Sequence, residues 1–295
     1  MISGWLNVFK ERGYTSSYIV RTLKNKFNIK KIGHYGTLDP LASGVLPIAL
    51  GEATKTIQFI TFNQKSYSFL INWGKETDTC DEEGKVLLYS DKRPSMAEIK
   101  SAIKKYFIGS IVQKPPIFSA VKVNGKRAYQ LARKNIQFEI KPKSIIVTRF
   151  ELLKVIDKNK AQFSIDCGPG TYVRSLARDL SKKLGTFGYA SDIIRLKNSY
   201  FGVSNSIRYD KVIKSNKLTF YNKLLPVDFV LQNIEEIKLE KKYSDMLKDG
   251  KIVFLSKYNN NAERDSNILI KCNSELVSIA NLKKGYIIPR RNFNI

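Results

Sequence analysis

Large apolar side chains recur at every second position of residues 66–73, and this pattern constrains the fold more than any other feature of the chain. The side chains on that face are Tyr67, Phe69, Ile71 and Trp73. Such alternation predicts a half-buried β-strand. Residues 15–27 instead repeat apolar side chains with a helical period, which predicts an amphipathic helix; those side chains are Ile19, Val20, Leu23 and Phe27. The two periods together predict a mixed fold of strands and helices.

Capping and turn residues predict further elements. Ser95 and Glu98 have the spacing of a capping box ahead of a second apolar helix. Asn124-Gly125 is a strong hairpin signal, and the lysines and arginines around it indicate a basic surface arm at about residues 110–140. Residues 144–156 and 161–167 have the composition of strands. The glycines that precede Arg174 lead into a further helix, with Arg174 in its first turn.

The domain organisation follows from the length and from the last quarter of the chain. A chain of 295 residues favours one large domain with a smaller one, or two domains of similar size. Beyond about residue 235, short apolar runs alternate with turn signals such as Asp249-Gly250, which is typical of a small β-rich domain. We therefore expect a boundary near Phe229, with domains at residues 1–229 and 230–295.

The charge of the chain favours a polyanion as its partner. There are 51 Lys and Arg residues against 26 Asp and Glu, a net charge of +25, and such a field attracts nucleic acid. The alternative is that a lysine-rich composition reflects only the nucleotide bias of a genome. Apolar runs such as residues 45–50 are too short to span a bilayer, and the start of the chain lacks the pattern of an export signal. We expect a cytoplasmic protein with no membrane partner.

Several kinds of chemistry are excluded by residue counts. The three cysteines are widely spaced and form no C-x-x-C pair, which argues against a disulfide framework and against a cysteine zinc site. His34 is the single histidine, and the glycine-rich phosphate-binding motifs are absent. The acidic loop at residues 78–84 does not have the spacing of an EF-hand. We expect no metal and no cofactor, so any catalysis falls to carboxylate, tyrosine, arginine or lysine side chains.

Asp39 is the leading candidate among these side chains. It stands alone among small and apolar residues in GHYGTLDPLASGVLPIALGEATK, residues 33–55. An Asp-Pro pair in a glycine-rich loop also forms structural turns, so the local sequence leaves both roles open. By the same local criteria Tyr67 fits the core beside its strand neighbours, and Arg174 fits a solvated helix face.

The same 23-residue stretch resembles the signature of the TruB-type pseudouridine synthases, the bacterial tRNA uridine-55 isomerases. KSY at residues 65–67, GKETDTCDEEG at 74–84 and GTYVRSLARDL at 170–180 are similar to further motifs of that family, in the same order. The basic arm resembles the family's insertion. The likeness covers residues 1–200 well, whereas residues 276–293 are only faintly similar to the family's PUA domain.

This resemblance implies a fold of the α/β (α+β) class, with a mainly antiparallel sheet, a deep cleft, a basic insertion arm and a small PUA-like β-barrel. It implies that Asp39 is the catalytic nucleophile or base, that Tyr67 stacks on the target base, and that Arg174 pairs with Asp39 and keeps it ionised. It also implies RNA contacts from the following residues: His34, Lys10, Lys122, Lys126, Arg127 and Leu196. Glu11 and Asn198 depart from the family pattern beside Lys10 and Leu196.

The implied reaction is the isomerisation of uridine 55 to pseudouridine in the T-loop of tRNA, with the base flipped out of its stack. The implied partner is the T-arm of tRNA, and no obligate protein partner is implied. One alternative is a non-catalytic tRNA-binding or tRNA-folding protein, and another is a guide-RNA-dependent enzyme for ribosomal RNA. The joint presence of Asp39, Tyr67 and Arg174 argues against the first, and the bacterial form of the motifs argues against the second.

Overall fold

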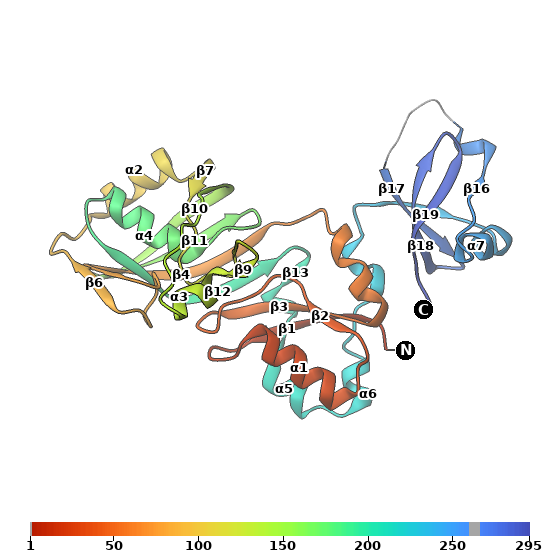
Figure 1. Ribbon diagram of the computed structural model, residues 1–295, viewed down its shortest axis with the longest axis horizontal. Helices are drawn as coiled ribbons and strands as arrows, with labels where there is room; N and C mark the ends of the chain where they lie inside the picture. Colours follow the sequence, from red (N-terminus) through yellow and green to blue (C-terminus); the bar gives the residue numbers. More distant parts are fainter. Residues whose placement is uncertain (1, 260–265) are drawn as a thin grey trace.

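A large mixed sheet organises the chain, whose computed structural model describes residues 2–259 and 266–295 (Figure 1). Its main path runs, in spatial order, β14 (Ile207–Arg208), β1 (Gly4–Lys10), β3 (Ser43–Leu50), β12 (Gly188–Asn198), β4 (Lys65–Trp73), β11 (Lys160–Cys167), β10 (Lys143–Asp157) and β7 (Gly109–Gln113). Two short strands lie off this path: β2 (Ile32–His34) pairs with β3, and β13 (Phe201–Gly202) pairs with β12.

Most neighbouring strands of this sheet are antiparallel, as the resemblance implied. Parallel pairing occurs between β1 and β14 and between β3 and β12. The central strand β4 lies between β12 and β11, and the side chains of residues 67, 69, 71 and 73 are buried on one of its faces. The alternation at residues 66–73 is therefore confirmed as a half-buried strand.

The predicted helices are also confirmed. The longer helices are α1 (Ser16–Phe27), α2 (Met96–Tyr106) and α4 (Val173–Lys183). Thr15 caps α1 by accepting a hydrogen bond from the backbone of Tyr18, and Ser95 and Glu98 form the capping box of α2. The shorter helical segments are α5 (Tyr209–Lys214), α6 (Lys217–Tyr221) and the 3₁₀ turns η1 (Gly51–Lys55), η2 (Ile57–Phe59), η3 (Val203–Asn205) and η4 (Val227–Val230).

Alternating side chains of the sheet supply two cores. Leu46 and Ile48 of β3 join the apolar sides of α1, α2 and α4 in the main core. Val45 and Ala49 of the same strand point to the opposite face and pack with η4 and with apolar residues of the C-terminal part, among them Phe293. The half of the sheet around β3 is therefore covered on both faces, which holds the loop before β3 in place.

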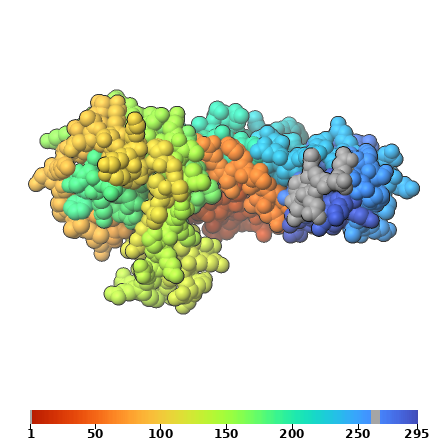
Figure 2. Space-filling view, turned by 90° about the horizontal axis from the view of Figure 1, so that it is seen from above, coloured from red at the N-terminus to blue at the C-terminus, as the bar shows by residue number. Residues whose placement is uncertain are grey.

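The basic arm projects from the body of the molecule (Figure 2). It spans residues 114–142 and contains the hairpin strands β8 (Lys122–Val123) and β9 (Lys126–Arg127) and helix α3 (Ala128–Arg133). The turn residues Asn124 and Gly125 have φ of 49° and 80°, as a two-residue hairpin requires. The expected start at about residue 110 is corrected, because residues 109–113 pair with β10 as the edge strand β7. A second, separate hairpin joins β5 (Lys75–Thr77) to β6 (Val86–Tyr89).

The C-terminal part is a small β-rich domain at one end of the molecule (Figure 1). Its five-stranded sheet has the order β15 (Glu235–Lys238), β17 (Ser266–Cys272), β18 (Glu275–Lys283), β19 (Tyr286–Asn292) and β16 (Val253–Phe254). Helix α7 (Lys241–Lys248) and the 3₁₀ turn η5 (Ser256–Tyr258) complete it. This arrangement agrees with the PUA-like domain that the resemblance implied, and we propose Phe229 as the boundary. Within the two described ranges, no helix combines the length and the apolar composition that crossing a bilayer requires.

Candidate active site

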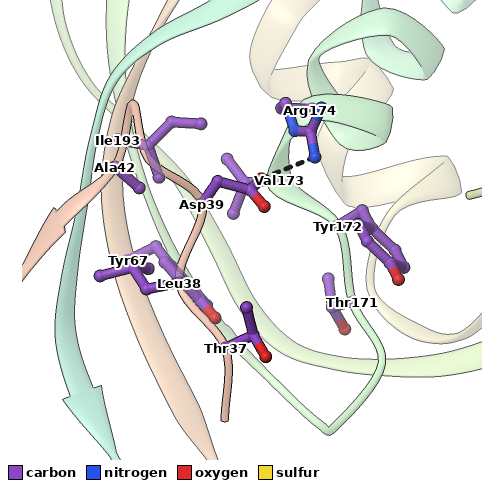
Figure 3. A pocket seen from close by; sticks show the side chains of 10 residues that line it. All are labelled: Thr37, Leu38, Asp39, Ala42, Tyr67, Thr171, Tyr172, Val173, Arg174 and Ile193. Carbon is purple, nitrogen blue, oxygen red and sulfur yellow. Dashed lines mark ion pairs between the residues drawn. The ribbon is translucent and has the colours of Figure 1, made fainter. Parts of the chain in front are cut away.

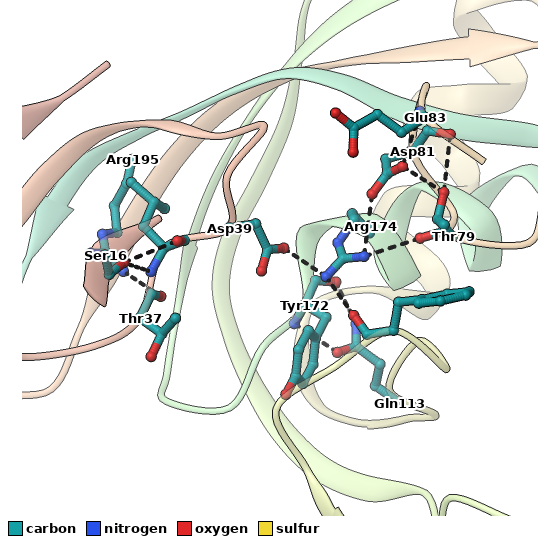
Figure 4. Close-up of polar contacts among 12 residues, drawn as sticks. Ser16, Thr37, Asp39, Thr79, Asp81, Glu83, Gln113, Tyr172, Arg174 and Arg195 are labelled. Carbon is teal, nitrogen blue, oxygen red and sulfur yellow. Dashed lines mark hydrogen bonds and ion pairs between the residues drawn. The ribbon is translucent and has the colours of Figure 1, made fainter. Parts of the chain in front are cut away.

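The loop that carries Asp39 connects β2 to β3 and is fixed from two sides (Figure 4). From α1, the hydroxyl of Ser16 donates to the carbonyl of Leu38 at 3.0 Å and accepts from the backbone N–H of Leu38 at 2.9 Å. From β12, the guanidinium of Arg195 donates to the carbonyls of Gly36 and Thr37. These bonds hold the backbone on either side of the carboxylate, so Asp39 occupies a defined position.

The side chain of Asp39 lines a pocket with a volume of about 90 Å³ (Figure 3). The lining residues come from four parts of the chain: Thr37, Leu38, Asp39 and Ala42; Tyr67 of β4; Ile193 of β12; and Thr171, Tyr172, Val173 and Arg174. The pocket therefore lies where the Asp39 loop, the central strands and the start of α4 meet, and it gathers all three predicted catalytic residues.

Asp39 and Arg174 form an ion pair across this pocket. The distance from Arg174 Nη2 to Asp39 Oδ2 is 2.6 Å. The arginine side chain is 7 % exposed, whereas the aspartate side chain is 44 % exposed. The pair thus joins a buried cation to a carboxylate that an incoming ligand can reach, and such charge-assisted contacts are strong and directional.

The acidic loop at residues 78–84 holds the arginine in place. Arg174 Nη1 donates to Asp81 Oδ2 and to the carbonyl of Thr79, each at 3.2 Å. Arg174 Nη2 also donates to the carbonyl of Phe118, at the base of the arm, at 3.1 Å. In sequence, this loop resembles a family motif and lacks the spacing of an EF-hand, but neither observation indicated a role for its carboxylates. The carboxylate of Asp81 binds the guanidinium, and within the described part of the chain no group of three or more His, Cys, Asp or Glu side chains is placed to hold a metal.

Tyr67 lines the pocket from β4 and is 7 % exposed. It therefore belongs to the core on one side and to the pocket on the other. Burial raises the pKa of its hydroxyl, and the neighbouring Arg195 opposes this change only in part. The phenol is therefore protonated at neutral pH. Tyr172 faces the pocket from the other side, where its backbone N–H donates to Gln113 Oε1 at 2.9 Å.

Arg195 is a residue that our sequence analysis missed. Its side chain is 1 % exposed, and besides the Asp39 loop it donates to the carbonyl of Val45 at 2.7 Å. No carboxylate pairs with it among the described residues. A buried guanidinium needs such partners for its fixed fork of donors. The available signal for it was an arginine directly between apolar residues of a strand, namely IIRL at residues 193–196.

Lys10 was expected to contact RNA, and the structure assigns it a different position. Its side chain is fully buried, and Nζ donates to the carbonyls of Glu11, Tyr14 and Pro40. Burial lowers the pKa of Lys10 to about 8. All three N–H donors of the ammonium are used in hydrogen bonds within the protein, and one of these bonds goes to the carbonyl of Pro40, the residue after Asp39. Lys10 therefore fixes the backbone beside Asp39 and is not presented to a ligand.

For Leu196 the resemblance implied a contact with RNA, and this role stays a prediction. Ile193, three residues earlier on β12, lines the pocket, and Leu196 does not. The pairing of β12 with β4 is irregular on both sides of Ile194 and Arg195. Such bulges change which side chains face the core, and simple alternation cannot locate them.

His34 and the arm lie outside the pocket. His34 is half-buried at the end of β2, and burial and Arg195 lower its pKa, so the ring is neutral at pH 7. Its Nδ1 atom is buried without a hydrogen-bond partner in the described structure. Lys122, Lys126 and Arg127 are exposed on the hairpin of the arm, and none of them pairs with a carboxylate among the described residues; Arg127 donates to the carbonyl of Ala120.

This arrangement suits chemistry at a sugar carbon. A reachable carboxylate can attack or stabilise an electrophilic carbon, and the ion pair with the guanidinium orients it. Tyr67 and Tyr172 line the same pocket and supply aromatic side chains against which a planar ring can pack.

Comparison with known proteins identifies a family with these features. Residues 24–173 match the model of the N-terminal domain of the TruB family of pseudouridylate synthases. A protein of Bradyrhizobium diazoefficiens named tRNA pseudouridine synthase B is 38 % identical over the whole chain and 86 % of its own length. A protein of the same name from Bartonella henselae is 36 % identical over the whole chain and 97 % of its length.

A solved structure shares the fold of the whole chain. The structure described as a Cbf5-Nop10-Gar1 complex contains a chain that aligns with a TM-score of 0.73 at 22 % identity, over 98 % of this chain and 84 % of that one. At this identity the likeness concerns the fold, and it includes both the large sheet and the small C-terminal domain.

Proposed function

Because the chain belongs to the TruB family of pseudouridylate synthases and is a pseudouridine synthase, we propose that it converts uridine 55 of the tRNA T-loop into pseudouridine. Relatives that match the whole chain are named for tRNA. The Asp39–Arg174 ion pair in a pocket beside Tyr67 is the observation that carries this proposal, because the reaction requires a carboxylate at the sugar of an extruded nucleotide.

The reaction rearranges bonds within one nucleotide. The C1′–N1 bond breaks, and its electron pair leaves with the uracil. The detached ring turns, C5 bonds to C1′, the proton on C5 departs, and N1 gains a proton, so atoms and electrons balance without a cofactor. In this proposal Asp39 acts at the ribose while the base is detached, either by bonding to C1′ or as a base.

Arg174 and Tyr67 support that step from two sides. Arg174 orients Asp39 through their ion pair, since its other donors are already held by Asp81, Thr79 and Phe118. Tyr67 offers its ring to the flipped uracil and its protonated hydroxyl to a proton transfer. Each role follows from the position of the side chain at the pocket.

Substrate binding is assigned to groups outside the pocket. We propose that Lys122, Lys126 and Arg127 contact phosphates, because they are exposed cations without carboxylate partners in the described structure. We propose that His34 enters the RNA loop and occupies the place of the extruded base, because its ring is neutral and its Nδ1 lacks a partner among the described residues. An extruded base must be replaced or its neighbours remain unstacked.

Pseudouridine mapping tests this function. An unmodified tRNA transcript and a ribosomal RNA transcript are incubated with the wild-type protein and with the variant Asp39→Asn, and pseudouridines are located by chemical modification and primer extension. We expect one new pseudouridine, at position 55 of the tRNA, with the wild-type protein only. Modification of ribosomal RNA alone would reject tRNA as the substrate, and equal modification by the variant would reject Asp39 as the catalytic group.

A further inference from the structure

Two exposed tyrosines lie beside the Asp39 loop and are not used by the site described above. Tyr14 and Tyr18 are 39 % and 40 % exposed. Their rings are stacked, with centroids 5.4 Å apart and planes 18° apart. Tyr14 also rests against the edge of the buried ring of Tyr209 at 5.2 Å. The pair is therefore a fixed aromatic surface, and little side-chain entropy remains to be lost when a ligand binds it.

The backbone around Tyr14 is bonded to the backbone around Asp39. The N–H of Gly13 donates to the carbonyl of Pro40 at 2.8 Å. Lys10 Nζ bridges the carbonyls of Tyr14 and Pro40. On the other side of Tyr14, Ser16 exchanges hydrogen bonds with Leu38. The tyrosine pair thus lies at the edge of the candidate active site, held to the loop that carries the carboxylate.

The charge beside the pair is positive. The guanidinium carbon of Arg21 lies 5.9 Å from the ring centroid of Tyr18, and Arg21 is exposed with no carboxylate partner in the described ranges. The nearby Glu11 is paired with Arg208 at 3.3 Å. Arg21, Tyr18 and Tyr14 form a set of flat groups of the kind on which unpaired RNA bases stack. A phosphate beside such a base would meet the charge of Arg21.

From these observations we infer that Tyr14 and Tyr18 form a stacking site for an unpaired base of the RNA substrate, next to the nucleotide that enters the pocket. The inference rests on the proposed function, because a stacking site beside the pocket meets an RNA base only when the pocket holds a nucleotide of the same RNA loop. Tyr18, the outer ring beside Arg21, provides the larger part of the contact, while Tyr14 fixes it against Tyr209.

A double-mutant cycle between protein and RNA tests this site. The RNA is an unmodified T-arm hairpin, alone or with a single abasic nucleotide at each loop position in turn. The proteins are the wild type, Tyr18→Leu, which removes the ring, and Tyr18→Phe, which keeps it. Fluorescence anisotropy gives each dissociation constant, and the thermal unfolding midpoint confirms that the variants are folded.

We expect Tyr18→Leu to weaken binding of the intact hairpin by about 5- to 150-fold, and Tyr18→Phe to bind like the wild type. At one loop position the abasic hairpin should weaken wild-type binding by a similar factor and leave the leucine variant with no further loss. Unchanged affinity of Tyr18→Leu, as a protein-docking role would give, overturns the inference. A loss that is the same with every abasic hairpin also overturns it.

Crosslinking provides a second measurement that needs no variant. Hairpins with 5-iodouridine at single loop positions are irradiated with the wild-type protein and digested with trypsin. The peptide of residues 13–21, which contains both tyrosines, should carry the RNA at one position. Crosslinks confined to other peptides contradict the site. Pseudouridine formation in the intact hairpin is scored separately, so failure of the proposed function and failure of this site give different results.

Discussion

In the pocket, Arg174 is 7 % exposed and is bonded to two carboxylates and two carbonyls, whereas in the arm Lys122 and Lys126 are exposed with no carboxylate partner among the described residues. The two regions use positive charge in different ways. The charge of Arg174 is committed to protein groups, which fixes geometry. The charges of the arm are left for a partner that approaches from solvent, which provides attraction without fixed geometry.

The net charge of the chain therefore does not indicate which cations take part in the reaction. The +25 net charge describes groups such as those of the arm. The cations near Asp39 are instead buried: Arg174 is paired with carboxylates, and Lys10 and Arg195 are bonded to backbone carbonyls. The two regions are nevertheless joined, because Ser175 and Arg178 of α4 both donate to the carbonyl of Lys114, where the arm begins.

The largest effect is expected at Asp39. Asp39→Asn keeps the size of the side chain and removes its charge, so we expect folded protein that binds tRNA but turns over at least about 10⁴-fold more slowly, equivalent to roughly 5 kcal/mol of barrier. Single-turnover pseudouridine formation measures this loss. Activity within about tenfold of the wild type would remove Asp39 from the chemistry and leave it a structural turn residue.

Tyr67 should separate proton transfer from stacking. Tyr67→Phe keeps the ring and removes the hydroxyl, and we expect it to lower the rate at saturating RNA by about 10² to 10⁴ while binding stays near the wild type. Tyr67→Leu removes the ring as well and should add a binding loss of about 1 to 3 kcal/mol. Rates and half-saturating RNA concentrations distinguish the two. If both variants match the wild type, Tyr67 is only a core residue beside Phe69.

The burial of Lys10 should change how the free energy of unfolding depends on pH. Its pKa is lowered from 10.5 to about 8 in the folded protein, so between these values the unfolded chain binds more protons at Lys10 than the folded chain does. The free energy of unfolding of the wild type should therefore rise with pH across this range, relative to Lys10→Met, by up to about 3 kcal/mol.

Urea unfolding at a series of pH values from 7.5 to 10.5 measures this difference. Because the surface lysines are common to both proteins, their effect cancels in the comparison. A constant difference between the two proteins over this range would mean that Lys10 titrates like an exposed lysine.

The smallest effect on chemistry is expected from the arm. Changing Lys122, Lys126 and Arg127 to alanine should weaken tRNA binding and flatten its dependence on log salt concentration by up to about 0.9 per lost phosphate contact. The rate at saturating RNA should remain near that of the wild type. An unchanged salt slope with unchanged affinity would show that the hairpin of the arm does not touch RNA.

The sequence predicted those elements whose formation depends on residues close together in the chain. The alternation around Tyr67, the capping box at Ser95 and the hairpin at Asn124 each depend on near neighbours in the chain, and each is confirmed. The family resemblance predicted that Asp39 and Arg174 form a pair, although the two residues are distant in sequence.

What the sequence could not provide depends on contacts between distant segments. Asp81 holds Arg174, and Arg195 holds the loop before Asp39, through pairings that no local pattern records. The resemblance implied that Lys10 contacts RNA, but its buried ammonium donates to three backbone carbonyls of distant and neighbouring residues. Irregular pairing along β12 changes which of its residues face the pocket, where Ile193 lies and Leu196 does not.

The central claim is that the chemistry resides in the pocket and the attraction for RNA in the arm. The most direct test measures the single-turnover rate at saturating RNA and the dissociation constant, on the same unmodified tRNA, for Asp39→Asn and for the triple alanine variant of the arm. We predict that the pocket variant loses its rate and keeps its affinity, whereas the arm variant loses affinity and keeps its rate. Equal losses of both quantities in the two variants would contradict the claim.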